Sequence, residues 1–430
     1  MRRYSPGHEF IDAAHAAAPQ PRLEQTAPSW VSSLAIGEQY RIPNSSYWGP
    51  SVVAQYKVNH PDLSQSVKHE GHLHVTRERG RLVDRMSYSG AGWNPDGCEF
   101  YLFGGGHNAS FGNEVLRCRV NTAQPAWEVI GQPSDVSALS TCEGGEHVPP
   151  LTWSANTFGR SYALDGKPKS PHICTRNFYL PRDRSLWNFG GGPLMWAGQN
   201  TIDRFDCVTG TWSAPNTYGQ AWASMTPNLG NREYRDYAIV DYRDESVYLI
   251  RHASGRLYKW GGPSNPLVLT SVGTLSGVYR FQGVAFFVWP TCIDSQRNCM
   301  VIATAGHGSA QGPLKIIKVD LATQVITLHE VTWRVPEVLF SGGHALEYDS
   351  HGDRYLLFTG GNFFYTIDSK TLEVGVLRFT GDPLPATQRF WILNHLRYSS
   401  DLKGTLLVSH GPWAGPTHEG CSIYFVRLHK

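Results

Sequence analysis

Residues Phe103–His107 read FGGGH and residues Phe189–Pro193 read FGGGP, so two apolar stretches end in the same run of three glycines. Each run follows two short apolar segments separated by a polar turn, as in SYSGAGWNPDGCEFYLFGGG (87–106). Apolar segments broken by Pro, Asp, Gly or Ser are typical of β-hairpins. Glycine tolerates the positive φ and the close backbone approach that are needed where a strand leaves a crowded centre. The glycine runs therefore predict a repeated all-β unit.

The same unit recurs along the chain. Clear copies span 172–192 and 235–255, and looser copies span 281–308, 343–361 and 390–411. A third strand is expected in NEVLRCRV, NTIDRFDCV, LKIIKVDL and FFYTIDS, and a fourth in AWEVI, TWSAP and EVTW, which carry Trp127, Trp212 and Trp333. Four-stranded units that cannot bury both faces alone stack around an axis as propeller blades. The sequence predicts an all-β, six-bladed β-propeller of four-stranded antiparallel blades.

This pattern resembles the kelch-repeat β-propellers, whose blades carry a glycine pair after the second strand and a later tryptophan. The resemblance covers roughly residues 87–430 and is clearest in the first two copies. It implies ring closure by a strand from the other end of the chain, because the last copy supplies only three strands and ends in CSIYFVRLHK. The stretch SWVSSLAIGEQYRIP (29–43) is expected to be the missing outer strand, which would remove an exposed sheet edge.

The expected organisation is an N-terminal arm (1–29) followed by one propeller domain (30–430), with long insertions at about 48–86 and 131–171. Loops of this length within a compact domain are usually functional or covered by a partner. The arm is rich in Ala, Pro and Gln and is expected to be disordered alone. These three segments are predicted to bind protein partners or further copies of the chain.

Charge and composition exclude several classes of partner. The formal net charge is +2, which does not favour a nucleic-acid-binding surface. No run of eighteen apolar residues predicts a membrane span, and the basic start has no apolar segment behind it. A soluble protein without a signal peptide is expected, either cytoplasmic or part of a virion. The eight cysteines form no zinc-binding spacing; free thiols are favoured, and a Cys292–Cys299 pairing across a hairpin turn stays open.

Histidines follow several of the second strands, and others stand near the start of first strands. In a propeller such positions gather at one mouth of the central channel, where imidazoles bind ligands or exchange protons near neutral pH. The alternative is that each imidazole hydrogen-bonds a turn and does nothing else. The predicted ligand-binding residues are His107, His252, His307, His344 and His410.

Two enzyme classes are worth comparing. Galactose oxidase, a kelch-type propeller, binds copper through paired Tyr and His ligands with one Tyr linked to a Cys, and the sequence offers no matching motif. No metal and no cofactor are therefore predicted. Some propeller lyases cleave polysaccharides with His and Tyr as proton carriers and Arg against the uronate carboxylate. The corresponding candidates are His107, His172, Arg176, Tyr234, Arg251 and His252.

The function that the sequence favours is a rigid binding or assembly module. A structural component of a phage virion or tail is suggested by analogy with other propellers. A carbohydrate-active enzyme, most plausibly a polysaccharide lyase, is the alternative, and whether the chain is an enzyme stays open. Asn108, Asn113 and Glu114, behind the first glycine run, are expected to be turn residues that lock neighbouring blades together.

Overall fold

The computed structural model describes about three fifths of the chain. The remaining residues, which include most of the segments between the blades, are not described. The described residues are 27–43, 45, 91–104, 113–132, 134, 162, 165–168, 177–191, 199–218, 237–251, 255–275, 289–304, 311–338, 340–341, 344–384, 395–409 and 422–430.

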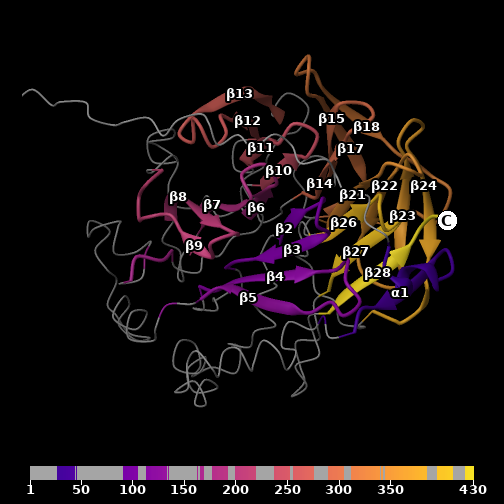
Figure 1. Ribbon diagram of the computed structural model, residues 1–430. Helices are drawn as coiled ribbons and strands as arrows, with labels where there is room; N and C mark the ends of the chain where they lie inside the picture. Colours follow the sequence, from indigo (N-terminus) through magenta and orange to yellow (C-terminus); the bar gives the residue numbers. More distant parts are fainter. Residues whose placement is uncertain are drawn as a thin grey trace, which may run out of the picture.

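Six antiparallel sheets surround a common centre as propeller blades (Figure 1). Blade 1 comprises β2 (Ala91–Asn94), β3 (Glu99–Leu102), β4 (Val115–Arg119) and β5 (Trp127–Gly131). Blade 2 comprises β6 (Asn177–Leu180), β7 (Ser185–Gly191), β8 (Gln199–Asp206) and β9 (Thr211–Trp212). Blade 3 comprises β10 (Tyr237–Asp241), β11 (Ser246–Arg251), β12 (Arg256–Trp260) and β13 (Leu269–Thr274).

The other three blades repeat the plan. Blade 4 comprises β14 (Thr291–Asp294), β15 (Cys299–Thr304), β17 (Lys315–Asp320) and β18 (Ile326–Glu330). Blade 5 comprises β21 (Ala345–Asp349), β22 (Arg354–Phe358), β23 (Phe363–Asp368) and β24 (Glu373–Arg378). Blade 6 comprises β26 (Leu396–Ser399), β27 (Gly404–Val408), β28 (Ile423–Arg427) and, from the other end of the chain, β1 (Glu38–Arg41). A two-stranded ribbon joins β16 (Gln311–Gly312) to β20 (Phe340–Ser341). The predicted six-bladed all-β propeller is confirmed.

The core lies between neighbouring blades rather than inside any one of them. The first strand of each blade contacts the first strand of the next from β2 through β26, so these strands form the hub. Between blades 2 and 3, Trp187 and Phe189 pack against Trp260 with ring centroids 5.0 Å apart in each pair. A single blade buries only one of its faces against each neighbour, and the ring is therefore the unit that folds.

Every hairpin between the first two strands of a blade uses the same backbone device. The residue just before the second strand adopts a left-handed conformation although it is not glycine, with φ between 48° and 62°. A type I turn followed by one left-handed residue suits the twist of the two strands. The six residues are Cys98, Arg184, Glu245, Asn298, Asp353 and Lys403. Because none of these residues is glycine and no residue type recurs among them, the amino-acid sequence does not reveal this repeated left-handed conformation.

The turns between third and fourth strands share a second device in blades 2, 4 and 5. An aspartate ends the third strand, and its Oδ1 accepts hydrogen bonds from the backbone N–H groups two and three residues later, at 2.7–3.0 Å. The third residue after each aspartate is a threonine, so the turn reads Asp-x-x-Thr. Local side-chain bonds of this kind fix the turn without help from distant residues. The three aspartates are Asp206, Asp320 and Asp368.

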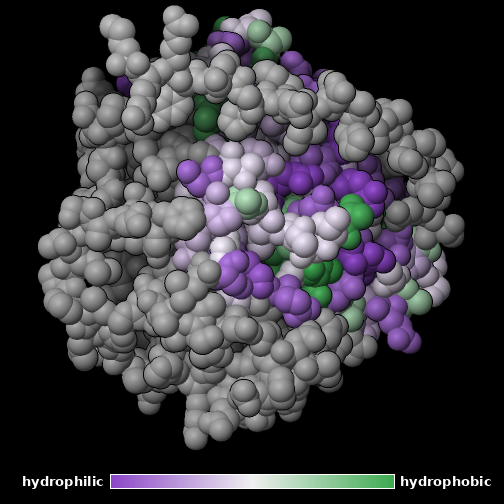
Figure 2. Space-filling view, turned by 60° about the vertical axis from the view of Figure 1, so that its left-hand side comes forward, coloured by the Kyte–Doolittle hydropathy of each residue, from purple (hydrophilic) through white to green (hydrophobic). Residues whose placement is uncertain are grey.

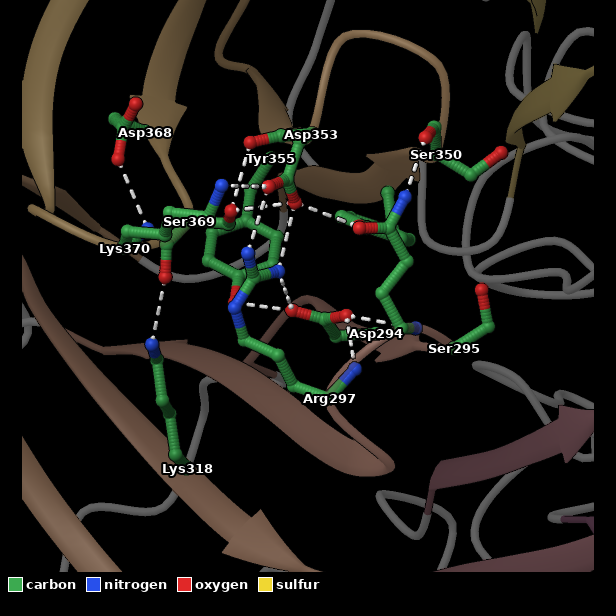
Figure 3. A network of polar contacts seen from close by, with 12 residues as sticks. Asp294, Ser295, Arg297, Lys318, Ser350, Asp353, Tyr355, Asp368, Ser369 and Lys370 are labelled. Atoms are coloured by element: carbon green, nitrogen blue, oxygen red, sulfur yellow. Dashed lines mark hydrogen bonds and ion pairs between the residues drawn. The ribbon is translucent and has the colours of Figure 1, made fainter.

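Polar contacts link successive blades at the hairpin-turn face. Between blades 4 and 5, the Arg297 guanidinium donates two parallel hydrogen bonds to Asp353, each 2.7 Å long, and a third to Asp294 at 2.9 Å (Figure 3). Asp294 is fully buried and also accepts a hydrogen bond from the Tyr355 hydroxyl at 2.8 Å. The bonds from Arg297 hold the pKa of Asp353 far below its usual range. Further links are Arg182 to Glu245, Arg243 to Ser295, Gln296 to Ser350 and His429 to Asp349.

The ring closes as the sequence predicts. In Figure 1 the indigo N-terminal segment lies against the yellow C-terminal strand, and β1 pairs antiparallel with β28. The short helix α1 (Ser29–Ser32) precedes β1, and its residue Trp30 stacks on Tyr40 with ring centroids 5.5 Å apart. The Arg427 guanidinium donates hydrogen bonds to three carbonyl oxygens of this segment, at 2.6–3.1 Å.

One predicted fourth strand is wrong. The fourth strand of blade 4 is β18, whereas Trp333 lies in β19 (Thr332–Trp333), which pairs in parallel with β24 of blade 5. Similarly, β25 (Thr380–Gly381) leaves blade 5 and pairs in parallel with β1 of blade 6. Each connecting segment thus adds a short fifth strand to the next blade and covers its outer edge. The sequence around Trp333 is equally compatible with the outer strand of blade 4 or of blade 5, so only the packing of the blades decides which edge it joins.

The described surface in Figure 2 is mainly hydrophilic, with a few scattered hydrophobic residues. Across the described ranges, the large hydrophobic side chains that are exposed are Ile36, Val208, Leu267, Val268, Val325 and Val338. Most of them lie in turns between strands. In the part of the chain that the structure describes, none of the helices has the length and apolar character to span a bilayer.

Candidate functional site

A row of polar side chains crosses blade 2 where an apolar row would be expected. Asn177 of β6 pairs with Asn188 of β7, which pairs with Asp203 of β8, so the three side chains share one face of the sheet. The next row on that face contains Tyr179, which stacks on Tyr101 of blade 1 with ring centroids 4.6 Å apart. The polar row therefore faces blade 1.

This row lies beside the first glycine run. The Asn177 side chain donates a hydrogen bond to the carbonyl oxygen of Phe103 at 2.5 Å. Gly104, the next residue, has φ +70°, which supports the expected need for glycine where the second strand turns away. The end of the second strand of blade 1 therefore lies against the polar row of blade 2. We call the region formed by Phe103, Gly104, Asn177, Asn188 and Asp203 the blade 1–2 junction.

The insertion at 131–171 is fastened to the blade 1–2 junction by its described residues. The Tyr162 hydroxyl donates to Asp203 at 2.7 Å, and the Asn113 amide donates to the carbonyl oxygen of Pro168 at 2.9 Å. Ser134 donates to Asp165 at 2.8 Å, and its backbone N–H donates to Asn113 at 2.7 Å. Asn113 therefore ties the insertion to blade 1, and no hydrogen bond of its side chain among the described residues reaches a neighbouring blade.

Asp203 is the titratable group at the centre of the junction. Its side chain is almost fully buried and accepts hydrogen bonds from the hydroxyls of Tyr162 and Thr201, at 2.7 and 3.0 Å. Burial raises the pKa of Asp203 to about 6, although these hydrogen bonds oppose the rise. A carboxyl group with this pKa exchanges its proton near neutral pH, which is the property required of a general acid or base.

Two buried polar atoms at the junction have no hydrogen bond of good geometry among the described residues. They are Asn177 Oδ1 and Trp212 Nε1. Trp212 packs on Phe103 at 4.5 Å between ring centroids, so both of these atoms lie near the first glycine run. Leaving a buried polar group unpaired costs about 1–3 kcal/mol. Their concentration in one place indicates a position for water or for a polar guest.

Replacing Asp203 is expected to change how stability depends on pH. The folded-state pKa of about 6 lies above the unfolded value of 3.8, so ionisation of Asp203 opposes folding. The protonated Asp203 side chain therefore contributes its full stabilisation below pH 4, and this stabilisation is lost as the pH rises through 6. Asp203→Asn should therefore gain stability relative to the parent protein by roughly 1.4 kcal/mol per pH unit between pH 4 and 6. Urea unfolding at intervals of pH measures this difference.

Asp320→Asn is the matched control. The backbone N–H donors of its turn lower the pKa of Asp320, so this carboxylate supports folding above its unfolded pKa. The free energy of unfolding of Asp320→Asn, relative to the parent, should therefore fall slightly as the pH rises. A flat difference for Asp203→Asn between pH 4 and 6 would show that Asp203 is not ionised at a cost in the folded protein.

Most of the histidines and other side chains singled out in the sequence fall outside the described residues. These are His107, His172, Arg176, Tyr234, His252, His307 and His410, whose assigned roles stay predictions. Arg251 is the last residue of β11. The sequence reasoning missed the polar row itself. Its signal was the presence of asparagines inside the apolar strands RNFYL and LWNFGGG, at Asn177 and Asn188.

His344 is the one candidate histidine that the structure describes. It directly precedes β21, as expected for a residue at the start of a first strand. Its side chain is buried and lies 5.2 Å from the ring of Phe340. Burial lowers the pKa of His344 to about 4, so the imidazole is neutral at pH 7.

A second set of ionisable groups lies on the propeller axis. Arg397 of β26 donates a hydrogen bond to Glu347 of β21 at 3.2 Å, and both side chains are largely buried. Tyr237 and Tyr242 of blade 3 lie close enough to interact electrostatically with Arg397. Blades 3 and 6 are opposite each other in the ring, so these residues meet only at the centre. Burial raises the pKa of Glu347, and the neighbouring guanidinium opposes the rise.

Neither metal ligands nor disulfides are found among the described residues. Within the described ranges, no three His, Cys, Asp or Glu side chains are grouped to hold a metal ion. In the β14–β15 hairpin, Cys292 pairs with Val301 and Cys299 with Asp294, and both thiols are free. The described free cysteines are Cys98, Cys118, Cys207, Cys292 and Cys299.

Comparison with known proteins gives likeness of fold alone. No protein-family model matches the chain, and no curated protein matches it in sequence. Among solved structures, the gluconolactonase XC5397 from Xanthomonas campestris has a TM-score of 0.43 and 12% identity, covering 81% of this chain and 88% of that one. YjhT has a TM-score of 0.42 and 9% identity, covering 78% and 92%. Sqt1 from Saccharomyces cerevisiae has a TM-score of 0.35 and 12% identity, covering 77% and 69%. At these values the likenesses support no conclusion about activity or ligand.

Proposed function

We propose that the chain is a rigid binding and assembly module, which associates with further copies of itself through the insertion at the blade 1–2 junction. The observation that carries the proposal is the fastening of this insertion by Tyr162, Asp165 and Pro168. Long segments that bind partners are commonly presented from a rigid scaffold in this way.

The rest of the ring suits this role because it is tightly linked. Bidentate and charge-assisted bonds such as Arg297 to Asp353 join successive blades, and the N-terminal strand closes the last one. A scaffold of this kind presents its loops with little loss of conformational freedom on binding. As part of the same proposal, the repeat is of the kelch type and the assembled protein is a structural component of a phage virion or tail. The arm (1–29) and the insertion at 48–86, which lie largely outside the described residues, also contribute contacts to the assembly.

The test replaces residues 135–161 with a short Gly/Ser linker. The linker can span the gap because Ser134 and Asp165 are hydrogen-bonded to each other, and all described junction residues are retained. The intact chain is expected to form oligomers at micromolar concentration, as measured by light scattering coupled to gel filtration. The variant should associate less while its melting temperature stays the same. An intact chain that remains monomeric, or a variant that associates equally well, contradicts the proposal.

Asp203 supports a second candidate, a polysaccharide lyase. The carboxyl group and the Tyr162 hydroxyl are 2.7 Å apart, and burial sets the carboxyl pKa to about 6. Arg176 immediately precedes Asn177, and His107 follows Phe103 by four residues, so two of the predicted catalytic residues are close in sequence to residues of this junction. In β-elimination a base removes the proton next to the uronate carboxylate and the bond to the leaving glycosidic oxygen breaks, which leaves an unsaturated uronate.

This second candidate makes a distinct prediction. With alginate, pectate or hyaluronan as substrate, a lyase raises the ultraviolet absorbance as unsaturated product forms. The double replacement of His107 and His172 by Ala should abolish that rise, and Tyr162→Phe should reduce it by two or more orders of magnitude. The double histidine replacement should leave the assembly state unchanged. No absorbance increase with any of the three polymers would remove the lyase.

A further inference from the structure

The ring-closing seam contains a cavity that no function considered above uses. Its volume is about 560 Å³, within the range of about 300–1,000 Å³ that is usual for small-molecule sites. Three separate parts of the chain build it: the closing strand β1, the segment after β25, and the start of β28. The lining residues are Tyr40, Arg41, Ile42, Pro43, Asp382, Pro383, Ser422 and Tyr424.

We propose that this seam pocket binds a neutral saccharide, with Arg41 and Asp382 as its hydrogen-bonding groups. Arg41 and Tyr424 are cross-strand partners of β1 and β28, and both side chains lie on the same face of the sheet. The Arg41 Nε donates to the Ser422 hydroxyl at 3.0 Å, which holds the guanidinium beside the cavity. The Asp382 carboxylate accepts a hydrogen bond from the Arg41 backbone N–H at 2.8 Å.

The segment after β25, which carries Asp382 and forms one wall of the pocket, is held rigidly. Gly381 has φ +89°, and a Cβ atom there would come within 2.3 Å of the Gln39 carbonyl oxygen. Only glycine therefore permits the close parallel pairing of β25 with β1. The Gln39 side-chain amide also donates a hydrogen bond to the Asp382 carbonyl oxygen at 2.7 Å, which ties this wall to β1. The groups that face a ligand are thus positioned before it binds.

The chemistry of the lining favours a neutral, hydroxyl-rich ligand. Arg41 and Asp382 carry opposite charges, so the pocket offers no net charge to a charged ligand. A sugar hydroxyl both donates and accepts, and it can satisfy a carboxylate and a guanidinium at once. Tyr424 adds aromatic surface on the face that carries Arg41, and Pro43 and Pro383 also line the pocket. The buried Gln39 Oε1, next to this wall, also has no hydrogen-bond partner among the described residues.

Occupation of the pocket should stabilise the closed ring. A ligand there contacts β1, β28 and the segment after β25 together, and these contacts exist only when the ring is closed. Binding to the folded state alone raises the melting temperature in proportion to the logarithm of ligand concentration. Thermal stabilisation is therefore a second readout, independent of direct binding.

The experiment uses the full chain with glucose, galactose, mannose, N-acetylglucosamine, maltose and cellobiose as probes, and glucuronic and galacturonic acids as charged comparisons. Saturation-transfer NMR and thermal shift are measured for each. At least one neutral sugar should bind and raise the melting temperature. Arg41→Gln and Asp382→Asn should each weaken that binding at least tenfold. Arg378→Gln, an exposed arginine of neighbouring β24 outside the pocket, should leave it unchanged.

Three results would overturn the proposal. They are the absence of binding by every neutral sugar, binding that survives both pocket substitutions, and stronger binding of the uronic acids than of their neutral counterparts. Unchanged melting of the unliganded variants shows that they fold. The seam pocket is independent of the blade 1–2 junction, so neither outcome bears on the proposed assembly through the insertion.

Discussion

Removal of residues 1–46 should abolish the cooperative melting of the protein and cause aggregation. The deletion removes β1, and with it the backbone partner of β28. It also takes away the buried side chains of Val31, Leu34 and Ile42, which pack in the core cluster between blades 6 and 1. Burial of three such side chains contributes roughly 5–9 kcal/mol, which is comparable with the whole stability of a typical domain at about 5–15 kcal/mol. Differential scanning calorimetry and light scattering measure the effect.

Deletion of residues 1–26 is the control, because it leaves every described residue in place. That protein should melt at the same temperature as the intact chain. A synthetic peptide of residues 27–46 added to the longer truncation should restore part of the transition by strand addition. If the chain lacking residues 1–46 melts like the intact protein, β1 is not required for closure.

The second large effect is expected on the propeller axis, where Arg397→Met should destabilise the protein by about 3–5 kcal/mol. The substitution keeps most of the apolar volume but leaves Glu347 buried without its cation. Because burial raises the pKa of Glu347, the stranded carboxyl should take up a proton as the pH falls. The loss should therefore be smaller at pH 4 than at pH 8 in urea unfolding.

A double-mutant cycle separates the pair from its surroundings. Glu347→Gln in the Arg397→Met background should recover most of the lost stability, since no buried charge then remains unpaired. Equal and additive losses for the two single changes would mean that the two side chains do not stabilise each other. Arg182→Met is the control, because this arginine is more than half exposed and its ion pair with Glu245 is long at 3.7 Å.

Much of the fold could be derived from the sequence because its determinants are local. A hairpin needs only alternating apolar residues and a turn, and the glycine runs at 103–107 and 189–193 mark where second strands end. Six copies of that pattern, and a last copy one strand short, predicted both the six blades and their closure by β1. The sequence also singled out Asn113, but as a residue that locks blades, whereas its partners Ser134 and Pro168 belong to the insertion that follows blade 1.

The tertiary structure decided everything that depends on which faces meet. Trp333 reads as a strand residue in either blade, and only packing assigns it to the edge of blade 5. Asp203 becomes a group with a pKa of about 6 because the assembled blade 1–2 junction buries it, although the hydrogen bond from Tyr162, 41 residues away, opposes the rise. Arg397 and Glu347 are 50 residues apart and meet because the first strands of neighbouring blades 5 and 6 pack together at the hub. Periodicity and turn chemistry are read along the chain, whereas burial and pairing of polar groups arise between distant segments, so they are fixed only when the ring is complete.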